Sequence, residues 1–241
     1  MCGRFVVAGA ADDLVALFDI DLVGEDLPDD SWNVAPTDRV PVVIDARDRN
    51  DPDGPPVRRL EPARWGLVPA WAKDMTAGAR AINARIETAA EKPAFAKAVA
   101  GRRAMVPANG YYEWQTVDGI KRPRFIHLPD GEWTLFAGLY EWWRDDTVDK
   151  TSPEHWVLST SILTRASSGP LEPIHDRMPV FLTPDLVDVW LDPETVGDES
   201  LLEAVAAGSA ETAERMTSHE VDRAVGSVRV NGPQLIQPLA G

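Results

Sequence analysis

Short apolar runs bounded by Gly, Pro or Asp recur along the whole chain. Many of these runs are rich in Val, Ile and aromatic residues, which favour β-strands. The pattern predicts strands at residues 3–8, 40–44, 58–65, 111–114, 121–128, 133–140, 156–163 and 227–230.

Four other segments combine helical spacing or helix-capping residues, and they predict helices at residues 12–18, 88–100, 183–190 and 198–208. Pro36 forces Ala35 out of the helical region, so residues 32–37 are expected to form a rigid extended turn. Residues 45–56 are polar and contain Pro and Gly, which predicts a hairpin loop. Because the helices are short and no linker divides the chain, we expect one α+β domain covering residues 1–241.

The composition excludes several classes of protein. The chain has 241 residues and one cysteine, so neither a disulfide framework nor a Cys-cluster zinc or iron–sulfur site is expected. No apolar run reaches the roughly 18 residues that a membrane span needs, and residues 1–20 lack a signal-peptide pattern. We therefore expect a cytoplasmic protein that has no membrane partner, no metal and no cofactor.

The net charge of −15 argues at first against a nucleic-acid partner, because neutralisation of phosphates dominates such binding. The acidic residues, however, lie in blocks at residues 19–30, 145–149 and 192–203, and most arginines lie outside these blocks. An acidic surface with one basic groove is compatible with this distribution. Charge alone therefore leaves both interpretations open.

Cys2 is the first candidate for chemistry. Once Met1 is removed, Cys2 carries a thiol and an α-amine on adjacent carbons, and such a pair captures an aldehyde as a five-membered thiazolidine ring. A strand over residues 3–8 would hold this terminus in a sheet. Taken alone, Cys2 is better explained as an incidental small residue after the start.

Two further stretches carry acid–base groups. Glu113 lies between large aromatic residues on a predicted strand, and desolvation there would raise its pKa and suit a general acid or base. Strand alternation places Glu113 with Tyr111 on one face and Tyr112 with Trp114 on the other. His175 lies on a loop stiffened by three prolines. Each group also has a purely structural interpretation. Glu113 could lie at the surface of a sheet, and His175 could form a structural His–Asp pair that stabilises its loop.

Two more stretches have weaker signals. If residues 82–87 form a strand, then Asn83, Arg85 and Glu87 share one face, which would suit a site that binds a charged ligand. Residues 65–71 hold Trp65 and Trp71 around a Gly and a Pro. They predict either a core cluster or a stacking surface of the kind that single-stranded nucleic-acid binders use.

Several motifs together resemble one family. They are Met-Cys-Gly-Arg-Phe at residues 1–5, Trp-Asn-Val-Ala-Pro-Thr at 32–37, Trp-Gly-Leu-Val-Pro-Ala-Trp at 65–71, Ile-Asn-Ala-Arg-Ile-Glu-Thr at 82–88, Gly-Tyr-Tyr-Glu-Trp at 110–114 and Pro-Ile-His-Asp-Arg-Met-Pro at 173–179. In this order they resemble the SOS response-associated peptidase (SRAP) family. The resemblance implies a compact α+β fold with a twisted, barrel-like, mainly antiparallel β core flanked by short helices.

The resemblance also implies a function in DNA repair. Members of the family bind single-stranded DNA that contains an abasic site and crosslink to it through the terminal Cys. By motif position, Cys2 is implied as the nucleophile, Glu113 as the acid/base, His175 as a second catalytic group and Asn83 as a site residue near the amine. The residues implied at the DNA-binding face are Arg4, Asn33, Pro36, Trp71, Arg85, Trp114, Thr164 and Arg177.

Two other functions remain open from the sequence. Cys2 could be the nucleophile of a cysteine peptidase in which His175 or Glu113 serves as the base. The chain could also bind single-stranded DNA with no covalent step. In each case we expect a monomer.

Overall fold

The computed structural model describes residues 2–9, 11–47, 51 and 53–239. Five strands close into a barrel: β4 (Arg39–Ala46), β5 (Val57–Trp65), β7 (Arg103–Ala108), β10 (Thr134–Arg144) and β11 (Trp156–Ala166). Four of the five contacts around this ring are antiparallel. The parallel pairing of β11 with β5 closes the ring, with Ser159 opposite Arg64 and Thr160 opposite Trp65.

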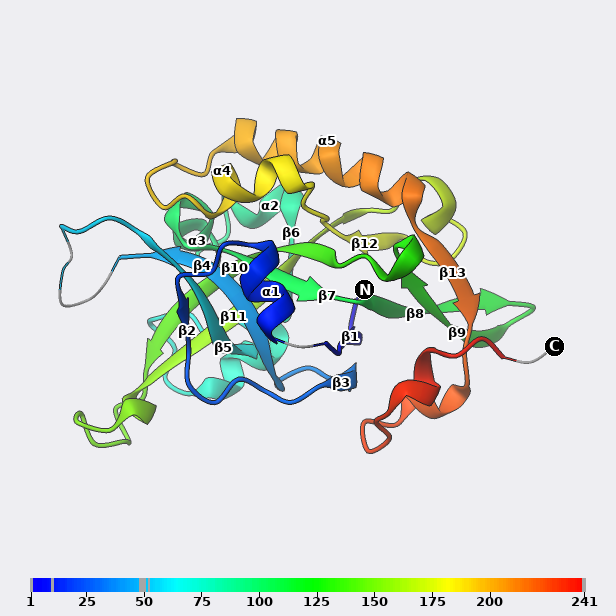
Figure 1. The fold of residues 1–241 in the computed structure, drawn as a ribbon, viewed down its shortest axis with the longest axis horizontal. Coiled ribbons are helices and arrows are strands. Elements are labelled where there is room, and N and C mark those ends of the chain that lie inside the picture. The colour runs from blue at the N-terminus through cyan, green and yellow to red at the C-terminus, as the bar shows by residue number, and fades with distance from the viewer. Residues whose placement is uncertain (1, 10, 48–50, 52, 240–241) are drawn as a thin grey trace.

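A second sheet lies beside the barrel, on the right in Figure 1. Its order is β13 (Thr217–Glu220), β9 (Ile120–His127), β8 (Gly110–Val117), β1 (Phe5–Val7) and β3 (Ser31–Val34). Strand β1 therefore has a partner on each side, with Phe5 opposite both Val34 and Tyr111. This pairing anchors the start of the chain in the interior, where the two sheets share one apolar core.

The remaining strands are short and lie at edges. They are β2 (Leu22–Val23), β6 (Asn83–Arg85) and β12 (Arg177–Pro179). Both β6 and β12 pair with β11, in parallel and antiparallel orientation respectively. Residues 83–85 and 177–179 therefore flank β11 on its two sides, although about ninety positions separate them in the sequence.

The helices are α1 (Ala11–Leu17), α2 (Ile86–Ala89), α3 (Ala96–Gly101), α4 (Val187–Leu191) and α5 (Glu199–Arg215). The longest of them, α5, runs along one side of the molecule, above α4 and α2 in the view of Figure 1. Asp198 caps its N-terminus, where the carboxylate accepts from the backbone N–H of Leu201. In the described ranges, no helix has the length and apolar character that crossing a membrane requires.

The expected α+β class with a barrel-like, mostly antiparallel core is confirmed, and the strands predicted between residues 40 and 163 are present within a few residues of their expected bounds. The predicted helix over residues 88–100 is wrong: α2 and α3 are separate short helices. Pro93 lies in the turn between them, where it has no N–H to donate to a continuous helix. The predicted loop at residues 45–56 falls partly on residues 48–50 and 52, which lie outside the described residues.

Four further predictions need correction. The stretch at residues 32–37 is not wholly irregular, because Trp32 to Val34 pair with β1 as part of β3. Strand β6 ends at Arg85, so Glu87 lies in α2 instead of sharing a strand face with Asn83. Helix α5 continues past Gly208 to Arg215. No strand forms at residues 227–230, whereas β13 at residues 217–220 was not predicted.

Candidate functional site

Cys2 lies in the shared core just before β1, and its side chain is fully buried. Its neighbours in this core cluster include Phe5, Trp65 and Tyr111. The thiol donates weakly to the carbonyl of Arg4, with a sulfur–oxygen distance of 3.9 Å. Burial, and after it the negative charge of Glu113, raises the pKa of the Cys2 thiol. The thiol is therefore protonated at neutral pH in this arrangement.

Asn83 contacts the backbone of Cys2 directly. Strand β6 presents Asn83 opposite Ile162 of β11, and the Asn83 amide Nδ2 donates to the Cys2 carbonyl at 2.8 Å. The other end of the same side chain, Oδ1, is buried and accepts no hydrogen bond from the described residues. Because most buried polar atoms in folded proteins have a partner, this oxygen is an acceptor available to a donor next to Cys2.

Glu113 lies on β8, on the face that carries Tyr111, and its side chain is only 3% exposed. Burial raises the pKa of Glu113, and the positive charge of protonated His175 acts in the opposite direction. The predicted alternation is confirmed, because Tyr111 packs in the core with Cys2 whereas Tyr112 and Trp114 pack in a separate cluster on the other side of the sheet. The local environment therefore suits a carboxyl group that holds its proton to a higher pH than an exposed Glu does.

His175 approaches Glu113 from the loop that precedes β12. Its Nε2 lies 3.9 Å from a carboxylate oxygen of Glu113. On the other side of the ring, Nδ1 lies 2.8 Å from Asp176 and 3.0 Å from the backbone N–H of Arg177. When Nδ1 accepts from Arg177, a neutral imidazole carries its proton on Nε2, towards Glu113. Asp176, which the sequence analysis considered only as a structural partner of His175, lies close enough to the same nitrogen to share control of where the ring proton sits.

Arg177 is held by an ion pair. Its guanidinium pairs with both carboxylate oxygens of Glu87 at 2.7 and 3.0 Å and also donates to the Thr164 carbonyl at 2.6 Å. The hydrogen bond from Arg177 holds the pKa of Glu87 below its usual range. Thr164 is fully buried, and its hydroxyl lies 3.4 Å from the carbonyl of Ala84. These contacts connect β12, β11 and α2 at one edge of the site.

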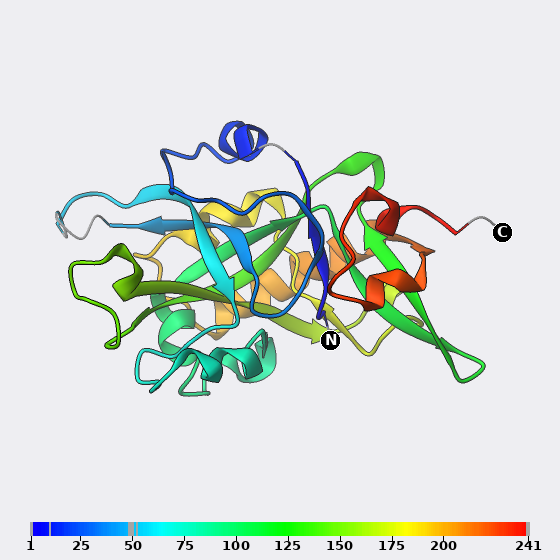
Figure 2. The same ribbon diagram turned by 90° about the horizontal axis from the view of Figure 1, so that it is seen from below.

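Arg4 and Asn33 bind the segment that follows β13. Arg4 donates to Asn33 Oδ1 and to the Val225 carbonyl, both at 2.9 Å. The Asn33 amide faces the carbonyls of Val225, Ser227 and Val230 at 2.8 to 3.3 Å. Figure 2 shows the C-terminal segment beside the N-terminal strand. In this structure the two side chains hold the C-terminal turn in place, and their expected role at DNA stays a prediction.

The remaining predicted DNA-binding residues lie at or near the surface. Trp71 is 70% exposed, on a loop whose backbone approaches itself closely at Gly66 and Gly78. Gly66 has a φ of +129°, and a Cβ there would lie 2.6 Å from the Gly78 carbonyl oxygen, so only glycine fits. Arg85 is exposed, whereas Pro36 and Trp114 are half-buried.

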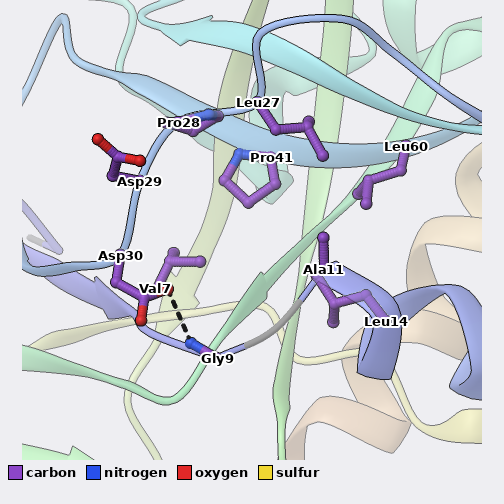
Figure 3. Close-up of a pocket in the computed structure, with 10 residues that line it drawn as sticks. All are labelled: Val7, Gly9, Ala11, Leu14, Leu27, Pro28, Asp29, Asp30, Pro41 and Leu60. Carbon is purple, nitrogen blue, oxygen red and sulfur yellow. Dashed lines mark hydrogen bonds between the residues drawn. The ribbon is translucent and has the colours of Figure 1, made fainter.

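Figure 3 shows an open surface pocket elsewhere in the molecule, between α1, residues 27–30 and strands β4 and β5. Apolar side chains such as Leu14 and Leu60 line it, with Asp29 and Asp30 at one side. None of Cys2, Glu113 and His175 lines this pocket. The candidate site is instead the cluster of the buried Cys2 and Glu113 with the half-buried Asn83, and His175 lies at its edge.

Within the described residues, no group of three or more His, Cys, Asp or Glu side chains could hold a metal ion. The functional groups at the candidate site are the thiol of Cys2, the carboxyl group of Glu113, the imidazole of His175 and the amide of Asn83.

The family model for SOS response associated peptidases (SRAP) matches residues 1–228. The chain belongs to the SRAP family. It is 37% identical to abasic site processing protein YoqW of Bacillus subtilis, over 98% of this chain and 99% of YoqW. It is 32% identical to abasic site processing protein YedK of Escherichia coli, over 99% of this chain and all of YedK.

A solved structure of a Bacteroides thetaiotaomicron protein superposes on this SRAP chain with a TM-score of 0.80 at 23% identity. The superposition covers 99% of this chain and all of the other. At this identity the likeness concerns the fold, which the two chains share over their whole length.

Proposed function

We propose that this SRAP protein takes part in DNA repair by binding abasic sites in single-stranded DNA and forming a covalent thiazolidine with them through Cys2. The observation that supports this most is the cluster in which Asn83 contacts Cys2 and Glu113 carries a raised pKa. The relatives YoqW and YedK are named abasic site processing proteins, which supports the same substrate.

The proposed reaction begins with the amine. After removal of Met1, the neutral α-amine of Cys2 attacks the aldehyde of a ring-opened abasic site to give a carbinolamine. Loss of water gives an imine, the thiol sulfur then bonds to the imine carbon, and the thiol proton passes to the nitrogen. One aldehyde and one aminothiol thus give one thiazolidine and one water, with no oxidant or reductant.

Glu113 is the proposed proton carrier for this sequence. Its protonated form donates to the departing hydroxyl during dehydration, and its carboxylate accepts the thiol proton during ring closure. Because burial raises the pKa of Glu113, both forms are accessible closer to neutral pH than for an exposed Glu. The acceptor oxygen of Asn83 is suited to orient an N–H of the α-amine. His175, at 3.9 Å from Glu113, is suited to assist opening of the sugar ring.

The thiol environment bears on the alternative peptidase function. Cysteine peptidases use a thiolate, which forms where nearby cations lower the thiol pKa. The Cys2 thiol has the opposite environment, because burial and Glu113 both raise its pKa. A reaction that starts at the amine and uses the thiol second agrees better with these groups.

DNA binding would have to be local, because the net charge is −15. Arg85 is exposed, so its guanidinium can reach a phosphate. Trp71 offers an exposed ring for stacking against a base. We expect this local binding to be salt-sensitive, with a log–log slope of about 0.7 for each phosphate contacted on a single strand.

The test combines mass and adduct formation. Intact mass first establishes that Met1 is absent from the purified protein. The protein is then mixed with single-stranded DNA that contains one abasic site and is analysed on a denaturing gel. A matched oligonucleotide with a tetrahydrofuran abasic analogue has no aldehyde and serves as the control.

A denaturant-stable adduct with the abasic strand and none with the tetrahydrofuran strand is the expected result. Binding of both strands without an adduct would instead support a non-covalent DNA-binding protein. Cleavage of a peptide substrate in a parallel reaction, with no DNA adduct, would support the peptidase.

A further inference from the structure

The loop that carries His175 is closed at its base and anchored in the core. The Ser167 N–H donates to the Asp176 carbonyl at 3.0 Å, which joins the two ends of the loop. Leu171 and Ile174 are buried in the shared core. Pro173 lies between the buried residues Leu171 and Ile174 and is exposed. Its carbonyl accepts a hydrogen bond from a side chain of β8 in the second sheet.

That side chain is Gln115, whose Nε2 donates to the Pro173 carbonyl at 3.1 Å. Gln115 follows Glu113 by two positions on β8, and strand alternation puts both side chains on the same face. A single strand therefore carries both the proposed proton carrier and a side chain that holds the loop of its neighbour His175.

The orientation of the Gln115 amide is itself fixed. Arg124, on the adjacent strand β9, lies opposite Glu113 and directs a guanidinium N–H to Gln115 Oε1 at 3.5 Å. Arg124 is held in turn by the carbonyl and hydroxyl of Ser218 on β13 at 3.0 to 3.2 Å. A cation can face only the oxygen end of the amide, so the N–H₂ end is directed to Pro173.

We infer that Gln115 is a positioning residue that sets the placement of His175 against Glu113. Only the expected effect on the rate of adduct formation rests on the proposed function. The contacts of Gln115 are present in the structure without DNA. The 3.9 Å separation of His175 from Glu113 depends on a loop, in which the His175 N–H donates to the Leu171 carbonyl at 3.3 Å, whereas Glu113 itself is fixed by strand pairing in the sheet. Loss of the Gln115 donor would let the loop shift and separate the two groups.

The variants Gln115→Ala and Gln115→Glu test this role in the full-length protein. Glutamate keeps the size of the side chain and its contact with Arg124 but has no N–H to donate to Pro173. Thr116→Ala changes the next residue of β8, which is exposed, and is the matched control. If both Gln115 variants fold, as their circular dichroism and unfolding midpoints would show, any common effect comes from the lost donor.

The first readout is independent of DNA chemistry. The chain has four histidines, so the His175 ring resonances can be assigned by NMR. We expect the His175 signals to shift or broaden in both Gln115 variants while those of His127, His155 and His219 stay unchanged. Unchanged His175 signals would overturn the inference, even if the proposed crosslinking is correct.

The second readout is the rate of adduct formation. We expect the rate at saturating abasic DNA to fall about tenfold in both variants, the factor that loss of one ordinary hydrogen bond gives. The DNA concentration that gives half the maximal rate should not change, since Gln115 is not proposed to touch DNA. A rate equal to that of Thr116→Ala would overturn the positioning role, whereas absence of an adduct in the parent protein would overturn only the proposed function.

Discussion

The two halves of the candidate site are built differently. Glu113 lies on β8, Cys2 lies just before β1, the strand that pairs with β8, and both side chains are buried. His175 lies on a loop, its side chain is 28% exposed, and hydrogen bonds to the loop rather than strand pairing hold it. The strand half is therefore fixed by the fold, and the loop half is adjustable.

The difference has a chemical consequence. A buried carboxyl group on a strand cannot escape its environment, so the raised pKa of Glu113 is a property of the folded state. The His175 ring is 28% exposed and lies on a loop, and such segments generally open at a smaller free-energy cost than core strands. Changes in the strand half should therefore alter the chemistry most, and changes in the loop half should modulate it.

The largest effect is expected for Cys2→Ala. This variant keeps an N-terminal α-amine but has no thiol, so ring closure is impossible and the denaturant-stable adduct should fall to background. The imine can still form, and borohydride should trap it as a stable secondary amine. Gels with and without borohydride measure both species. A stable adduct in Cys2→Ala without borohydride would contradict the thiazolidine.

Glu113→Gln is expected to lower the rate of adduct formation about 10²–10³-fold, within the range for loss of a general acid–base. The amide is similar in size but carries no exchangeable proton of suitable pKa. In the parent protein the rate should also decline as the pH drops through the raised pKa of Glu113, and this decline should be absent from the variant. Single-turnover rates across a pH series measure both effects.

Glu132→Gln is the control for this variant, because Glu132 lies at the surface in an ion pair with Arg215. It should have the parent rate at every pH. If Glu113→Gln reacted at the parent rate, Glu113 would not be the proton carrier, and the strand half would serve only to position Cys2.

His175→Gln should have a smaller effect, about tenfold, because its ring is partly exposed and general acid–base groups of this kind contribute less when solvent can replace them. Glu172→Gln, in the same loop and exposed, is the control. Single-turnover rates compare the two with Glu113→Gln. A loss as large as that of Glu113→Gln would remove the distinction between a fixed half and an adjustable half.

Strand periodicity explains what could be predicted from the sequence. The alternation of Tyr111 and Glu113 against Tyr112 and Trp114 follows from the pleat alone, and the structure has that arrangement. The approach of Asn83 to the Cys2 carbonyl depends instead on the pairing of β6 with β11. Such a pairing is a long-range feature that no local pattern encodes.

Local strand propensity also gave a wrong prediction where a side chain hydrogen-bonds the backbone of a distant segment. Residues 227–230 have the composition of a strand, but the Asn33 amide lies against the carbonyls of Ser227 and Val230 and holds them in a turn. The role of Gln115 was missed for a related reason. Its partner is the carbonyl of Pro173, fifty-eight positions away, and a backbone carbonyl has no sequence signature.

The smallest expected effect concerns stability and has a defined sign. Because burial raises the pKa of Glu113 above its value in the unfolded chain, the protonated form favours the folded state. This contribution is fully present below the ordinary pKa of about 4.5 and is lost as the pH rises through the folded value. Glu113→Gln, which has no charge to bury, should therefore gain stability relative to the parent at neutral pH.

The measurement is the denaturant midpoint of both proteins at about pH 4 and at pH 7. The gain of Glu113→Gln should be larger at pH 7 than at pH 4, and Glu132→Gln should show no such dependence. A Glu113→Gln variant less stable than the parent at pH 7 would mean that its partners stabilise the carboxylate more than burial penalises it. In that case the folded state would favour the charged form of Glu113, and burial of this side chain would not lower the stability of the protein at neutral pH.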